Sequence, residues 1–114
     1  MADDGRHFRV AEILARLPGP HGERLVLAFE RGTLELELYA PRGSDPQTPH
    51  TRDELYVVVT GSGQFANGPM RHAFGPGDVL FVPAGVEHHF ASFTDDLAAW
   101  VIFYGPEGGE VLNA

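Results

Sequence analysis

The chain has 114 residues, of which 43% are hydrophobic, enough for one compact domain and too few for two. Sixteen acidic residues outnumber eight Lys plus Arg, so the formal net charge is −8. Nucleic acid and anionic membranes are therefore poor partners, because phosphate-rich surfaces are bound by basic ones. The sequence contains no Cys, so imidazole or oxygen atoms must hold any metal ion.

The N-terminal segment predicts one short helix at residues 8–17, ended by Pro18 and Gly19. Its apolar side chains follow the spacing of one helix face: Val10, Ile13, Leu14 and Leu17. The segment is charged, and the sequence has no apolar run approaching the roughly 18 residues of a membrane span. We therefore expect a soluble, cytoplasmic protein with a flexible segment at residues 1–5.

After the helix, the apolar period changes from 3.6 to 2. In TLELELYA (33–40) the leucines alternate with Glu35, Glu37 and Tyr39, which predicts a strand with one face buried. Further strands are expected at 25–29, 53–59, 62–66, 70–74, 78–82, 88–93 and 97–104. Asn67-Gly68 and the GPGD segment at 75–78 suit tight turns between them. Many short strands with little helix predict an all-β sandwich or barrel, and local patterns leave this choice open.

The last predicted strand, LAAWVIFYG, is apolar on both faces. Leu97, Ala99, Val101 and Phe103 alternate with Ala98, Trp100, Ile102 and Tyr104. One face of such a strand can cover a partner subunit, so we expect a homodimer, although a strand enclosed between two sheets would show the same pattern.

Side chains able to bind a metal are spaced along TPHTRDELYVVVTG. In extended backbone Thr48, His50, Glu54 and Tyr56 point to the same side, so an imidazole and a carboxylate can enter one cavity. If the strand that begins at His88 is a neighbour, this second imidazole completes a set of three ligands. An inert hydrogen-bonded pair is the alternative interpretation.

These two segments resemble the paired motifs of the cupin superfamily. The second motif is Gly, five residues, Pro, one residue, Gly, two residues and His, and it is matched in full by Gly77, Pro83, Gly85 and His88. Its final Asn is replaced by Ser92.

The first cupin motif is matched at His50, Glu54 and Gly61, and Gly43 stands near the place of its leading Gly. The first His of its His-x-His pair is replaced by Thr48. This departure concerns a fourth ligand and leaves the expected fold unchanged.

The resemblance implies a double-stranded β-helix, the jelly-roll cupin barrel, with a short N-terminal helix. The cupin domain is expected at residues 6–105, followed by a tail at 106–114. A metal held by His50, Glu54 and His88 is expected inside the barrel, with Thr48 or Gln47 as a further ligand or as the holder of a bound water. The pocket wall is expected to include Tyr56, Phe81, Phe90 and Trp100.

Two imidazoles and one carboxylate suit Fe, Mn, Ni, Co or Zn, and they resemble the facial triad of non-haem iron enzymes. Three protein ligands leave coordination positions open for a small-molecule substrate, so we expect a metal-dependent enzyme, with dioxygenase chemistry favoured. The alternatives are a Lewis-acid isomerase, decarboxylase or lyase, and a non-catalytic barrel that binds a sugar or metabolite. No general base stands out beyond the ligands. His89 follows His88 and is expected to point to the opposite face.

Overall fold

The computed structural model describes residues 5–111. Within them lie one short helix and eight strands: α1 (Val10–Leu14), β1 (Leu25–Arg31), β2 (Leu34–Tyr39), β3 (Asp53–Thr60), β4 (Gly63–Asn67), β5 (Met70–Phe74), β6 (Val79–Val82), β7 (His88–Phe93) and β8 (Ala98–Tyr104). The helix has the expected position but is shorter than residues 8–17. Most of the segment predicted to be flexible, and the end of the predicted tail, lie outside the described residues.

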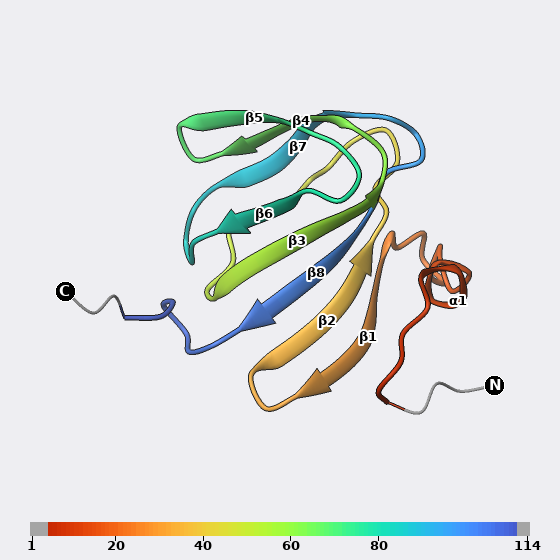
Figure 1. Ribbon diagram of the computed structural model, residues 1–114, viewed down its shortest axis with the longest axis horizontal. Coiled ribbons are helices and arrows are strands. Elements are labelled where there is room, and N and C mark those ends of the chain that lie inside the picture. Colours follow the sequence, from red (N-terminus) through yellow and green to blue (C-terminus); the bar gives the residue numbers. More distant parts are fainter. Residues whose placement is uncertain (1–4, 112–114) are drawn as a thin grey trace.

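The strands form two antiparallel sheets that face each other (Figure 1). The larger sheet has the order β1-β2-β8-β3-β6, and the smaller sheet has the order β5-β4-β7. Pairing of β8 with both β2 and β3, and of β4 with β7, gives the interleaved connectivity of a jelly roll. The predicted all-β barrel is therefore confirmed. Among residues 5–111, no helix is long and apolar enough to cross a membrane.

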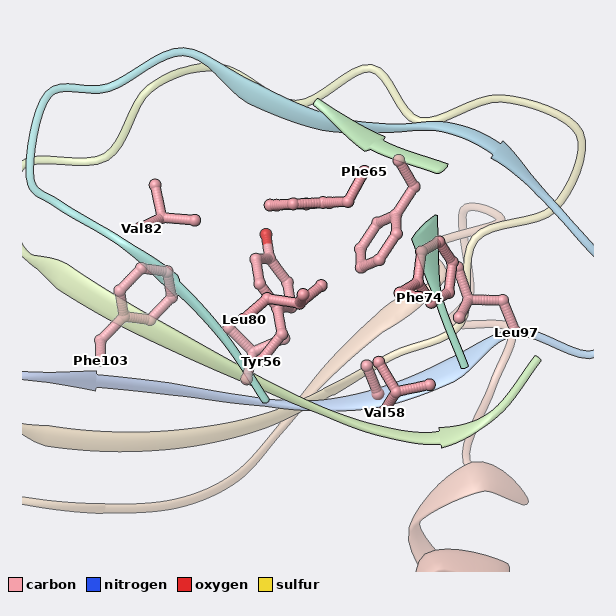
Figure 2. Packing of buried hydrophobic residues seen from close by; sticks show 11 residues of the cluster. Tyr56, Val58, Phe65, Phe74, Leu80, Val82, Leu97 and Phe103 are labelled. Carbon is pink, nitrogen blue, oxygen red and sulfur yellow. The ribbon is translucent and has the colours of Figure 1, made fainter. Parts of the chain in front are cut away.

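Apolar side chains from both sheets fill the space between them. Figure 2 shows Tyr56 of β3 within this core, together with Phe65 of β4 and Phe74 of β5. The Phe65 ring is fully buried, and its centroid lies 4.8 Å from that of Phe90 and 5.5 Å from that of Tyr56. Tilted and edge-on ring contacts of this kind pack the two sheets together.

The two faces of β2 have different surroundings. Leu38 is fully buried, as the alternating pattern predicts, on the face where α1 packs and buries Ile13. Leu34, near the hairpin end, is 37% exposed, so the leucine face is only partly covered. Because side chains alternate along a strand, Glu37 and Tyr39 point the other way and line a cavity on the inner side of the sheet.

Both faces of β8 contact apolar side chains. Ala99 and Val101 belong to the core, whereas Trp100 and Ile102 are half-buried on the outer face. Two cross-strand rows of apolar residues run over this outer face: Phe29, Leu36, Ile102, Leu55 and Phe81, and beside them Val26, Leu38, Trp100, Val57 and Val79.

Gly63 provides a test of how closely β4 and β7 approach. A Cβ at this position would lie 1.9 Å from the carbonyl oxygen of Ser92, a backbone atom that cannot move without breaking the strand pairing. We expect Gly63→Ala to lower the free energy of unfolding by more than about 1 kcal/mol in urea denaturation. Gly75→Ala is the control, because its Cβ would meet no atom within 4 Å. Equal losses in the two variants would contradict this account.

Candidate metal centre

The three predicted ligands lie together at one end of the barrel interior. His50 precedes β3, Glu54 lies on β3, and His88 begins β7. Their candidate ligand atoms lie within 4.8 Å of one another. Oε1 of Glu54 is 3.1 Å from Nε2 of His88 and 4.0 Å from Nε2 of His50. Glu54 and His88 are buried, whereas the His50 side chain is 35% exposed, so the cluster is accessible past His50.

The hydrogen bonding of His88 shows that the cluster fits a metal ion. Nδ1 of His88 is 2.9 Å from the Val86 carbonyl oxygen, which can only accept, so Nδ1 carries the hydrogen. Nε2 of the neutral ring therefore presents a lone pair to Oε1 of Glu54, which is also an acceptor. Neither buried atom has a hydrogen-bond partner among the described residues. Two buried acceptors this close require a cation or a proton between them, and this donor set suits a divalent transition metal.

The two imidazoles have different pKa values. Burial lowers the pKa of His50, and His88 lowers it further, against the opposing effect of Glu54. His50 is therefore neutral near pH 7 and able to bind a metal. Burial also lowers the pKa of His88, but Glu54 and the Val86 carbonyl together raise it by more, so the net shift is upward. A proton can thus occupy the position of a metal between His88 and Glu54, and the two would compete.

A backbone contact links the two sequence motifs. The amide of Gly85 donates a hydrogen bond of 2.7 Å to the carbonyl oxygen of His50. Gly85 has a φ of 79°, which favours glycine, in the turn from Pro83 to Val86. The turn that leads into His88 therefore also fixes the backbone of His50, so the spacing of both ligands depends on one local structure.

A cavity of about 110 Å³ lies against His50 and Glu54. Its wall is apolar at Val101 and Phe103 and carries the carboxyl group of Glu37. A second hollow of about 250 Å³, which adds Glu35 and Arg52 to the lining, shares His50, Glu37 and Phe103 with the first. A small molecule could therefore enter along this hollow and reach the cluster.

Glu37 is a functional candidate that the sequence pattern did not single out. Its carboxyl group lines both hollows and makes no hydrogen bond or ion pair with any residue in the described range. Burial, followed by repulsion from Glu35 and Glu54, raises its pKa to about 7. The alternation in residues 33–40 places Glu37 on the face opposite the leucines. It does not show that a helix covers the leucine face, which leaves Glu37 on the inner side of the sheet.

The residues proposed to supply a fourth ligand lie in a hydrogen-bonded loop. The Gln47 amide nitrogen donates to Asp45 at 2.7 Å, and its oxygen accepts the Tyr56 hydroxyl at 2.7 Å. Asp45 also accepts from the Tyr39 hydroxyl and from the backbone amide of Phe90, a role that its loop position did not indicate. Gln47 therefore lines the cavity with both ends of its amide engaged. Thr48 is exposed and does not line the cavity.

Of the four aromatic residues expected in the pocket wall, Tyr56 lines the cavity and the other three do not. Phe81 is 46% exposed, because it alternates with the buried Leu80 on β6. Trp100 lies on the outer face of β8, opposite in direction to the cavity residue Val101. Phe90 is buried in the core and does not line the cavity.

Stability as a function of pH tests the environment of Glu37. The pKa of Glu37 is 4.5 in the unfolded chain and about 7 in the folded protein. Between these two pH values the carboxyl group is protonated in the folded protein and ionised in the unfolded chain. Stability therefore falls as pH rises through this range. We expect metal-free wild type to lose about 1–3 kcal/mol relative to Glu37→Gln between pH 5 and pH 8. Urea denaturation in a chelator measures this difference, and a difference independent of pH would exclude the raised pKa.

Three comparisons place the chain among known proteins. An uncharacterised protein of Streptomyces coelicolor is 36% identical over 102 residues, which are 88% of this chain and 96% of that protein. The TT1209 protein of Thermus thermophilus has a similar fold, with a TM-score of 0.60 and 23% identity over 80% of this chain and 92% of that one. A cupin-2 domain protein of Shewanella frigidimarina gives a TM-score of 0.57 and 20% identity over 71% and 79% of the two chains. Residues 35–104 match the cupin domain family, and the chain therefore belongs to the cupins.

Proposed function

We propose that this cupin binds one divalent transition metal through His50, Glu54 and His88, and acts as a metal-dependent enzyme on a small molecule. The observation that supports this most directly is the pair of buried, unpartnered acceptor atoms on Glu54 and His88. A cavity next to the same carboxylate provides room for a substrate. A metal site that serves catalysis, unlike a structural one, keeps coordination positions open in this way.

The chemistry of the proposed enzyme has two candidates. The facial-triad likeness favours a dioxygenase, which remains a prediction from the sequence. Lewis-acid chemistry, in which the metal polarises a substrate oxygen, is favoured by a specific observation: Glu37 places a second, unpaired carboxyl group in the cavity. A barrel that binds a metabolite without turnover is the alternative outside the enzyme class.

Metal analysis tests the site itself. We expect about one Fe, Mn, Ni, Co or Zn per chain in protein purified without an affinity tag and reconstituted. Elemental analysis of His50→Ala, Glu54→Ala and His88→Ala should show metal content greatly reduced, because each loses one of three ligands. His89→Ala is the matched control, because His89 is exposed while His88 is buried. No metal in reconstituted wild type would contradict the proposal and favour a metal-free binding barrel.

A homodimer is the assembly that we propose. The two apolar rows on the outer face contain no charged residue, so two copies that meet there would bring no like charges of these rows into contact. At the β6 edge of this face, Val79 and Phe81 are 59% and 46% exposed. A two-fold axis would pack the same apolar patch of two copies together.

Light scattering after size exclusion tests this assembly. We expect wild type at twice the mass of the chain and Phe81→Asp at the mass of one chain, because the new charge would be buried in the interface. Met70→Asp is the control, because Met70 is 58% exposed at the β5 hairpin, away from this face. A monomeric wild type, or a dimer that Phe81→Asp leaves intact, would exclude this interface.

A further inference from the structure

We propose that Glu37 is the general base of the cavity, and that the substrate is a small uncharged molecule that loses a proton from an O–H or C–H group next to a metal-directed oxygen. This inference rests on the proposed function, because it assumes a metal at the triad. It assigns a catalytic role to a residue outside the cupin motifs. It also narrows the substrate to a chemical class that includes α-hydroxy ketones and catechols.

The position of Glu37 carries the first part of the inference. Glu37 lies on β2, and its cross-strand partner on β8 is Val101, whose partner on β3 is Tyr56. The side chains of all three residues line the cavity that contains Glu54. Glu37 therefore faces the same small volume as the metal ligands, from a different strand, and a bound molecule would lie between them.

The surroundings of Glu37 leave its carboxylate free to accept a proton. The neighbouring Glu35 is paired with Arg52 at 3.0 Å, whereas no described residue donates a hydrogen bond or offers an ion pair to Glu37. Arg52 lowers the pKa of Glu37, but its effect is smaller than those of burial, Glu35 and Glu54, which raise it. A partly buried carboxylate without a hydrogen-bond partner costs stability, and groups of this kind are concentrated at functional sites.

The charges around the cavity indicate an uncharged substrate. Among the described residues, Arg52 is the only arginine that lines the two hollows. Its guanidinium is engaged by Glu35, by the Thr33 carbonyl and by the face of Phe103. It is therefore unavailable for a substrate carboxylate or phosphate. A divalent ion at the triad would carry two positive charges, and the carboxylates of Glu54 and Glu37 carry one negative charge each. The formal charge of the site would therefore be zero.

Proton transfer to Glu37 fits this charge balance. The substrate O–H or C–H bond breaks, its electron pair stays on the substrate, and the proton binds a carboxylate oxygen of Glu37. The substrate gains one negative charge while Glu37 becomes neutral, so the remaining site holds one positive charge opposite the new anion. No oxidant or reductant is needed, and return of the proton to another substrate atom would complete an isomerisation.

The test uses 4-nitrocatechol as a probe, because its ionisation state is visible in its absorption spectrum. The protein is loaded with Zn²⁺, and the spectrum of the bound probe and the protons released on binding are measured near pH 8 in weak buffer, in wild type and in Glu37→Gln. If Glu37 accepts the second hydroxyl proton, wild type releases about one proton fewer than the variant for each probe bound as the dianion, because that proton stays on Glu37. If Glu37 acts only through its charge, both proteins release the same number of protons for each dianion bound.

Control measurements separate the possible outcomes. Glu30→Gln removes the same charge from an exposed position that lines neither hollow, so its proton release should equal that of wild type. Glu37→Ala should behave like Glu37→Gln, which covers the case in which one variant does not fold. Equal proton release for each bound dianion in wild type and in the Glu37 variants would overturn the proposal while leaving the metal site intact. Failure of wild type to bind Zn²⁺ would instead refute the proposed function.

Discussion

The structure of the site depends on two buried acceptor atoms that face each other across 3.1 Å, Oε1 of Glu54 and Nε2 of His88. Glu54 is 1% exposed, and the ring centroids of Tyr56 and Phe65 lie 6.1 Å and 6.3 Å from that of His88. Both atoms are buried and lack a hydrogen-bond partner among the described residues, so the repulsion between two lone pairs has to be relieved by a proton or a cation. The Val86 carbonyl makes this requirement strict, because it fixes the His88 hydrogen on the other ring nitrogen.

The jelly-roll topology brings these two atoms together. Glu54 belongs to the five-stranded sheet and His88 to the three-stranded sheet, so their contact exists only when the two sheets face each other. Backbone contacts near the site support this arrangement: Gly85 holds the His50 carbonyl, and the buried Asp53 accepts hydrogen bonds from the amides of Ala84 and Glu110. The ligands are therefore positioned by turns and strand ends, while the aromatic core behind them sets the distance between the sheets.

The sequence predicted the strands and the three-residue cluster because both depend on local spacing. Periods of two residues, glycine-containing turns and the motif positions are all visible in the chain itself. Which face of a strand points inward is a tertiary property, and that is where the predictions were incomplete. Phe81 and Trp100 are apolar and were assigned to the pocket, yet they lie on the outer face; Glu37 is charged and was passed over, yet it lies inside. Asp45 lies in an irregular loop, where no period indicates its three hydrogen bonds.

The two carboxylates of the cavity have environments that separate their roles. Glu54 faces two imidazoles, which suits a ligand, whereas Glu37 has no partner within the described residues and faces open space. The replacement of a motif histidine by Thr48 strengthens this division. Thr48 points to solvent and Gln47 is held by Asp45 and Tyr56, so neither residue is placed to fill the position that the missing imidazole would occupy. A metal at this triad would thus keep more of its coordination sphere for substrate, and the cavity that admits the substrate is the one into which Glu37 projects.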